Sequence, residues 1–207
     1  MRLGRVLVLA AAGLSVTACS SLGGGEFGYG GYSLVRVRDV RVGDDSMVVR
    51  PPREWNKQSS QLFVDINAVE DWTQNGPYLD SISFVTGLKD GKTLVRQRGR
   101  DDRQVPNFRS NMTAPEIAAM IESLFRVRGG TIDFKTTALL PRTFMGAPGF
   151  QQDFEHLDSD EVRRRGRVVG AVINGRLYMI LFDATQSHYY AASLPDFEAI
   201  VASARRA

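Results

Sequence analysis

Short segments in which apolar and polar positions alternate run through the first half of the chain, as in strands with one face in a core. In the first segment Val35 and Val37 alternate with arginines, but Val40 and Val42 have the opposite parity. This change of phase predicts a β-bulge near Asp39. Further strands are expected at 47–50, 62–66, 79–86 and 93–98.

A turn containing Asp90 and Gly91 separates the segments 79–86 and 93–98. Aspartate followed by glycine favours a tight connection between two strands, so these segments are expected to form a β-hairpin.

The C-terminal third has the strongest strand pattern of the chain. Strands are expected at 131–139, 150–157, 167–173 and 176–182. Asn174 and Gly175 join the last two, and both residue types accept the positive φ angles of a type I′ hairpin turn. Because these two strands are apolar at almost every position, we expect them in the middle of a sheet that is covered on both faces.

Two amphipathic helices are also predicted. Thr113 and Glu116 form a capping box at the start of the first helix, and Gly129 ends it. The second helix is expected to begin at Ser193, with Pro195 in its first turn. The apolar faces contain Ile117, Met120, Ile121, Leu124 and Phe125 in the first helix, and Phe197, Ile200, Val201 and Ala204 in the second. The predicted fold class is α+β, an antiparallel sheet packed with helices, in one globular domain over residues 34–207.

The N-terminus has the layout of a secretory signal peptide, expected at residues 1–18. A short basic start precedes an apolar run, Val6–Val16, which is too short to span a bilayer because spanning needs roughly 20 residues. The residues Val16, Thr17, Ala18 and Cys19 resemble the lipobox of bacterial lipoproteins. The resemblance implies cleavage before Cys19, a diacylglyceryl thioether on its sulfur and an acyl chain on its new amine. Several acyl chains on one residue hold a protein firmly on a membrane.

Residues 19–33 are expected to form a tether made of the lipidated cysteine and a glycine-rich coil. Ser20 and Ser21 follow the cysteine, where an aspartate retains many lipoproteins in the inner membrane. The resemblance therefore implies an outer-membrane location with the domain facing the periplasm.

The charge balance and the cysteine content of the sequence limit which classes of partner and which kinds of site we expect. The chain has 26 basic and 23 acidic residues, and removal of Arg2 and Arg5 with the leader brings the two signs close to balance. This balance gives no support to nucleic-acid binding. Cys19 is the only cysteine, so the chain can form neither an internal disulfide nor a cysteine-based metal site.

The C-terminal order of a strand, the Asn174-Gly175 hairpin, the strand 177–182 and the sequence Ser-Leu-Pro-Asp-Phe-Glu before a final helix resembles the end of PsbP-like domains. The resemblance implies an α/β/α sandwich of the kind used as non-catalytic extrinsic subunits and lipoproteins. A second resemblance, to a family of proteobacterial envelope lipoproteins without an assigned activity, rests on residues farther upstream. These are Glu70-Asp71-Trp72-Thr73, Gly76-Pro77, Leu79-Asp80, Phe84, Asp90-Gly91, Pro106-Asn107-Phe108-Arg109 and Met112.

Candidate catalytic chemistry is sparse, and we expect no cofactor and no metal. His156 and His188 are the only histidines, and an envelope hydrolase would need one of them paired with a carboxylate such as Asp153 or Asp183. The acidic cluster at 153–161 does not have the spacing of a calcium-binding loop. Together with the adjoining Arg163, Arg164 and Arg165 it predicts a charge-balanced hairpin tip.

The best candidate for a binding surface is the polar stretch 97–111 with its neighbours, because arginines and aromatic side chains are enriched at protein interfaces and anionic sites. Its members are Trp72, Arg96, Arg98, Phe108 and Arg109. The leading hypothesis is a tethered, non-enzymatic binding or assembly module for an envelope protein or cell-wall component. Two alternatives stay open, the hydrolase and a carrier of a hydrophobic ligand, which would need an apolar cavity between sheet and helix.

Overall fold

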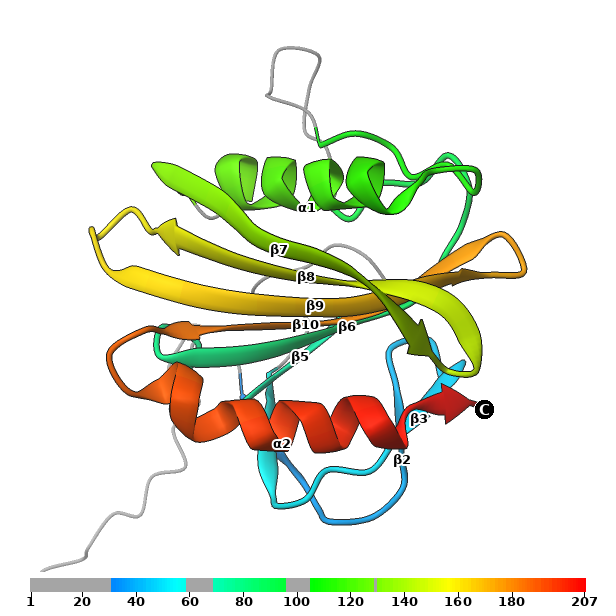
Figure 1. Ribbon diagram of the computed structural model, residues 1–207. Helices are drawn as coiled ribbons and strands as arrows, with labels where there is room; N and C mark the ends of the chain where they lie inside the picture. The colour runs from blue at the N-terminus through cyan, green and yellow to red at the C-terminus, as the bar shows by residue number, and fades with distance from the viewer. Residues whose placement is uncertain (1–30, 59–68, 96–104, 129) are drawn as a thin grey trace, which may run out of the picture.

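A computed structural model describes residues 31–58, 69–95, 105–128 and 130–207 (Figure 1). Eight antiparallel strands form one sheet in the order β1-β4-β5-β6-β10-β9-β8-β7, and three short strands form a second sheet in the order β11-β3-β2. In chain order the elements are β1 (Tyr32–Val35), β2 (Val40–Val42), β3 (Met47–Val49), β4 (Trp55–Gln58), β5 (Val69–Thr73), β6 (Asp80–Leu88), α1 (Ala114–Arg128), β7 (Asp133–Phe144), β8 (Ala147–Leu157), β9 (Arg163–Ile173), β10 (Arg176–Thr185), α2 (Tyr189–Ser203) and β11 (Arg205–Arg206).

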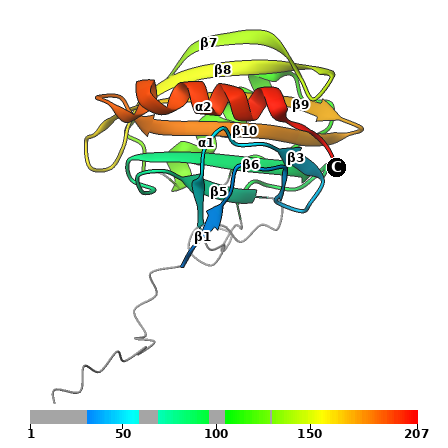
Figure 2. The same cartoon turned by 90° about the horizontal axis from the view of Figure 1, so that it is seen from below.

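The elements form three layers, with the large sheet in the middle. Helix α1 lies on one face of this sheet, whereas α2 and the small sheet lie on the other (Figures 1 and 2). Each face has its own apolar cluster, one around Phe108, Ile121 and Phe154 under α1, and one around Trp72 and Phe182 under α2. The structure confirms the predicted fold class of an antiparallel sheet packed with helices.

Strand β10 occupies the centre of the sheet and is buried on both faces, as its sequence predicts. Leu177, Met179 and Leu181 pack in the α1 cluster, and alternate residues such as Ile180 and Phe182 pack in the α2 cluster. The turn before it has Asn174 at φ 51° and Gly175 at φ 72°, which are the positive angles expected of a type I′ connection.

The predicted bulge near Asp39 is wrong. Val35 ends β1 in the large sheet, and Val40 begins β2 in the small one. The parity of the apolar positions changes there because the chain leaves one sheet and enters another.

The hairpin expected from 79–86 and 93–98 is also wrong. Asp90 and Gly91 do turn the chain, and the Lys92 amide donates to the Lys89 carbonyl over 3.1 Å. However, β6 pairs with β5 and β10 on its two sides, so no edge is free for a returning strand. Residues 93–95 therefore leave the sheet, while 96–98 and the strand expected at 62–66 lie outside the described residues.

Strands β7 and β8 are longer than the pattern predicts and form a hairpin across Met145 and Gly146, both at positive φ. Pro141 lies within β7, which is an edge strand, where a residue without an amide proton is tolerated.

The first helix is confirmed. The Thr113 amide and hydroxyl both donate to Glu116 Oε2, at 2.7 and 2.9 Å. The second begins at Tyr189 rather than Ser193, so Pro195 lies inside it. No helix within the described ranges is long and apolar enough to cross a bilayer.

Gly166 offers a test of the packing under α1. It pairs with Phe154 across β8 and β9, and a Cβ at Gly166 would lie 2.0 Å from the phenyl ring. We expect Gly166→Ala to lower the free energy of unfolding by about 1–3 kcal/mol through overpacking, as measured by urea denaturation. Gly31→Ala is the control, since no atom lies within 4 Å of its added carbon. Equal stability of the two variants would contradict this packing.

Candidate functional site

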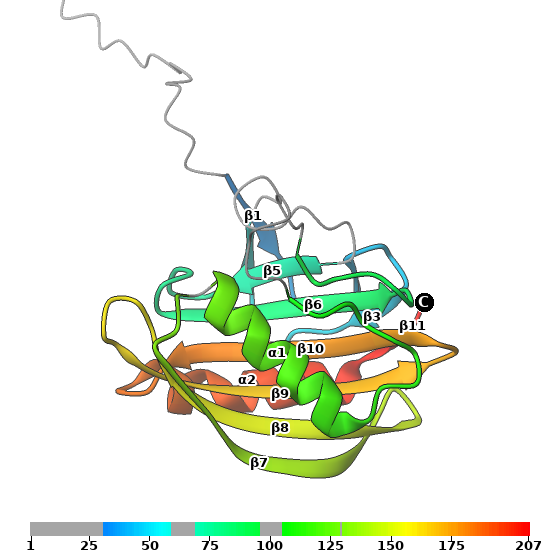
Figure 3. The same cartoon turned by 90° about the horizontal axis from the view of Figure 1, so that it is seen from above.

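A cavity of about 340 Å³ lies on the α1 side of the large sheet. Its floor comes from strands β5, β6 and β10, and one wall comes from the C-terminal half of α1, which lies across the sheet (Figure 3). The described lining consists of Gln58, Val69, Asp71, Pro77, Ser81, Ser83, Val85, Leu94, Val95, Leu124, Phe125, Met179, Leu181 and Asp183.

The strand register divides the cavity floor into an apolar end and a polar end. At one end Val85 of β6 lies between Val69 of β5 and Met179 of β10. In the next row Ser83 lies between Asp71 and Leu181.

A third row pairs Ser81 with Asp183. Polarity therefore rises along the strands, and a molecule lying along them would meet an apolar surface at one end and carboxyl groups at the other.

Asp71 is the most unusual group in this lining. The Ser83 hydroxyl donates to its Oδ1. Burial at the cavity floor raises the pKa of Asp71 above its ordinary value, the Ser83 hydrogen bond opposes this effect, and the neighbouring Glu70 carboxylate adds to it.

The negative charge of Glu70 is compensated by neighbouring groups of the protein. It points to the α2 side, where it accepts from Trp72 Nε1 and from Lys57 Nζ, each over 2.7 Å. Asp71 forms no ion pair with any cation of the described residues.

A buried polar network forms the other border of the cavity. His156 Nε2 lies 2.9 Å from Asp183 Oδ1, and Arg164 Nε donates to Asp183 Oδ2 over 2.7 Å. His156 Nδ1 lies 3.2 Å from the Thr131 hydroxyl. His156 and Arg164 also line a second hollow of about 290 Å³ on the far side of the network. Asp183 is therefore held by two partners, in contrast to Asp71.

This network contains the histidine–carboxylate pair that the hydrolase alternative requires, but its surroundings favour a structural role. Both ring nitrogens of His156 are engaged, and the ring packs 4.9 Å from Phe125. Thr131 lines neither hollow. His188 takes no part, because it is exposed at the start of α2.

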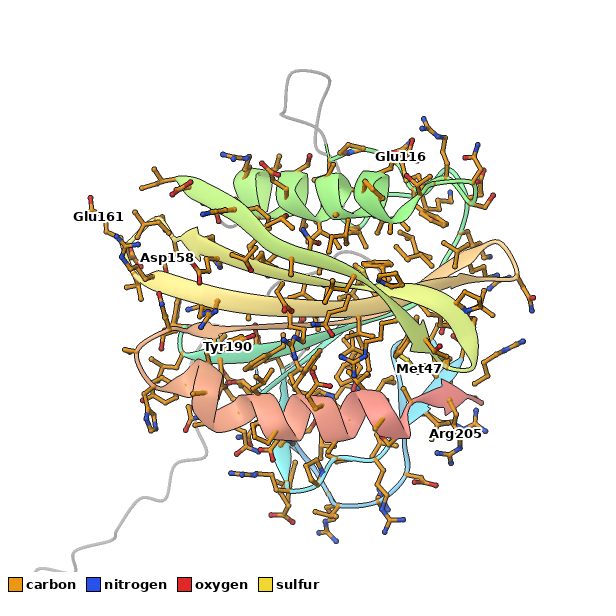
Figure 4. The ribbon with its side chains drawn as sticks, in the orientation of Figure 1. Met47, Glu116, Asp158, Glu161, Tyr190 and Arg205 are labelled. Carbon is orange, nitrogen blue, oxygen red and sulfur yellow. The ribbon has the colours of Figure 1, made fainter. Side chains whose placement is uncertain are left out.

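The hairpin tip predicted from the acidic cluster is present at the turn between β8 and β9. Asp158 and Glu161 lie at its outer end (Figure 4), and Glu161 adopts a positive φ of 60°. Among the described residues no group of three or more histidine, cysteine or carboxylate side chains is arranged to hold a metal ion.

The structure does not bring the predicted binding surface together. Trp72 and Phe108 are both 0% exposed and lie in the apolar clusters on opposite faces of the sheet. Neither can contact a partner while the core is intact. Arg109 is exposed and lies 3.7 Å from Glu116, while Arg96 and Arg98 lie outside the described residues.

Sequence reasoning missed Asp71 and Ser83 as site residues. The signal that could have found them is parity, because both occupy strand positions whose neighbours on the same face, Val69 and Val85, are apolar. A polar residue on an apolar face marks either a buried network or a site.

Replacement of Asp71 by asparagine keeps the shape of the side chain and removes its charge. Because the folded state raises the pKa of Asp71, it holds the proton more tightly than the unfolded chain does. The resulting stability is complete below the ordinary value of 3.8 and is lost as the pH rises through the raised pKa. We expect Asp71→Asn to be nearly neutral at about pH 3 and to increase the free energy of unfolding at about pH 7, measured by urea denaturation.

Asp160→Asn is the matched control, since it removes one exposed carboxylate from the turn after β8. The same pH-dependent gain in both variants would show that net charge, and not the burial of Asp71, is responsible.

No protein-family model matches the sequence, and no curated protein matches it. Among solved structures, the chain is similar to cyanobacterial PsbP (CyanoP) from Synechocystis, with a TM-score of 0.53 and 12% identity over 88% of this chain and 96% of that one. It also matches the Ran-binding protein Mog1p of Saccharomyces cerevisiae, with a TM-score of 0.48 and 10% identity over 85% and 95% of the chains. LpqN of Mycobacterium tuberculosis, involved in cell envelope biogenesis, follows with a TM-score of 0.35 and 9% identity over 87% of each chain. The domain thus has a PsbP-like fold, and at these identities the likeness extends to the fold alone.

Proposed function

We propose that this protein is an outer-membrane-anchored periplasmic lipoprotein that acts as a non-enzymatic binding module. The observation that carries the binding role is the cavity of about 340 Å³, which is mostly apolar and contains one carboxyl group, Asp71, without a countercharge among the described residues. Ligand sites are typically concave, largely apolar and roughly 300–1,000 Å³ in volume, with a few polar groups that orient the ligand.

The anchor is proposed from the sequence. The basic start, the short apolar run and the lipobox that ends at Cys19 support export, cleavage and acylation. The leader and Cys19 lie outside the described residues, but the glycine-rich stretch leads from Cys19 directly to β1 at the edge of the large sheet. A tether there would hold the domain at the membrane surface, with the cavity close to the attachment strand, since Gln58 of the cavity lining pairs with Tyr32 of β1.

Of the binding roles open from the sequence, the cavity favours a carrier of a hydrophobic ligand over a module that holds an envelope protein or a cell-wall component. A concave, mostly apolar cavity suits a small molecule, whereas protein partners bind mostly to broad surfaces. The hydrolase alternative has less support, because both nitrogens of His156 are engaged and Arg164 shares Asp183.

The anchor is tested by the N-terminal peptide of the protein isolated from cells. Mass spectrometry is expected to find a peptide that begins at Cys19 and carries acyl chains, and density-gradient fractionation is expected to place the protein in the outer membrane. Cys19→Ala should remove the acyl mass and take the protein out of that fraction, whereas Ser20→Ala should change neither. An unacylated wild-type N-terminus, or an intact leader, would overturn the anchor.

The binding role is tested by photocrosslinking in living cells from the rim of the cavity. A benzophenone side chain is introduced in place of Tyr78, which is 78% exposed and follows Pro77 of the cavity wall. Replacement of Leu140, which is 52% exposed on β7 at the opposite edge of the sheet, is the matched control. We expect small-molecule mass adducts from position 78 and none from position 140. Equal adducts from both positions, or crosslinks to protein alone, would contradict a carrier.

A further inference from the structure

We propose that the cavity binds an amphiphile with a single apolar chain and a cationic head, and that Asp71, supported by Ser83, recognises the head. This inference rests on the proposed carrier function and specifies its ligand class. The observation behind it is the direction of polarity along the cavity floor, combined with a carboxyl group for which the described chain provides no countercharge.

The apolar end of the cavity provides room for a hydrocarbon chain. Val69, Val85 and Met179 lie side by side on three adjacent strands, so their side chains form one continuous apolar row. Leu94, Val95 and Leu124 contribute to the walls. Burial of a chain against this surface is favoured in proportion to the apolar area removed from water.

The polar end favours a hydrogen-bond donor with positive charge. The described lining contains two carboxyl groups, of Asp71 and Asp183, and no lysine or arginine. Arg164 and His156 already hold Asp183, so its charge is compensated within the protein. Asp71 has only the Ser83 hydroxyl among the described side chains, and that bond uses Oδ1.

A carboxylate or phosphate head would be repelled at this end, because it would bring a second negative charge next to Asp71 in a partly desolvated site. An ammonium group would give Asp71 the charge-assisted hydrogen bond that the folded chain does not provide.

The ionisation of Asp71 is linked to this binding. Burial raises the pKa of Asp71, and a bound cation would favour the ionised form and lower that pKa again. Affinity for a cationic amphiphile is therefore expected to fall as the pH falls through the pKa of Asp71, whereas affinity for an uncharged amphiphile of the same length should not follow this titration.

Octylammonium and 1-octanol are suitable probes, since they have the same chain and differ in the head. The protein as isolated from cells, held in phosphatidylcholine nanodiscs, carries ¹³C-methyl methionine, and binding is followed by NMR. Met179 lines the cavity and reports on it, whereas Met47, buried in the small sheet on the other face, is the internal control. We expect both probes to shift the Met179 signal and to leave the Met47 signal in place.

Two variants separate recognition of the head from occupancy of the cavity. Asp71→Asn should weaken octylammonium binding by about tenfold and leave octanol binding unchanged. A tenfold change corresponds to the loss of about one charged hydrogen bond. Asp160→Asn, with the same loss of charge on an exposed turn, should change neither. Val69→Phe, which places a larger side chain on the cavity floor, should weaken the binding of both probes, and urea denaturation confirms that this variant is folded.

The outcomes are distinct. Equal binding of both probes with no effect of Asp71→Asn would overturn the recognition of a cationic head and leave the carrier function standing. Failure of both probes to shift Met179 would overturn the carrier function together with this inference. If Asp160→Asn also weakened octylammonium binding, the net charge of the protein would explain the effect, and the proposed role of Asp71 would be overturned.

Discussion

Burial of β10 on both faces is the constraint on which the rest of the structure depends. A strand whose side chains are apolar in both directions is stable only where each face of its sheet is covered. The chain meets this requirement with two separate helices, α1 from the middle of the sequence and α2 from its end (Figure 1). The neighbours β6 and β9 then align on β10 over most of its length and extend the sheet outward to its edges.

Two-sided burial also restricts where charged groups can lie on the inner strands. Asp80 is fully buried, yet it accepts hydrogen bonds from the Thr73 hydroxyl and from the amides of Gln74 and Asn75. Glu70 and Asp183 likewise have donors or cations around them. These buried carboxylates are therefore each compensated by hydrogen-bond donors or cations of the protein. Asp71 differs, because it has the Ser83 hydroxyl but no cation among the described residues, and such a carboxyl group in a cavity is a candidate for a functional role.

The sequence predicts the architecture well where the physical signal is local. The Asn174-Gly175 turn, the Thr113–Glu116 capping box and the apolar strands beside that turn each depend on neighbours within a few residues. The errors occur where the outcome depends on distant partners. The Asp90-Gly91 turn forms, but the edge of β6 that a hairpin would use belongs to β10, which lies far along the chain. Pro141 is accommodated for a related reason, since β7 has no strand on its outer side.

The candidate site was harder to predict than the fold for a specific reason. Aromatic residues and arginines suggested a surface, but Trp72 and Phe108 are core residues on opposite faces of the sheet. Composition cannot distinguish a buried aromatic side chain from an exposed one, because both environments favour the same residue types. The signal for the site was the alternation of side chains between the two faces of each strand. Once β5, β6 and β10 are placed side by side, Asp71 and Ser83 lie on an apolar face.

The proposed lipid anchor and the observed cavity are both features that a carrier of an apolar ligand would need. An apolar ligand is poorly soluble in the aqueous periplasm, so a protein that binds it gains from a fixed position beside the bilayer, which raises the effective concentration of the ligand near the site. The proposed tether would lead to β1 at one edge of the sheet, and the cavity lies between α1 and strands β5, β6 and β10, with Gln58 of its lining paired to β1. A PsbP-like fold alone does not require a cavity there, since fold likeness does not specify function. What gives this chain its proposed role is therefore the gap beside α1, together with the one carboxyl group in it that the protein itself leaves without a countercharge among the described residues.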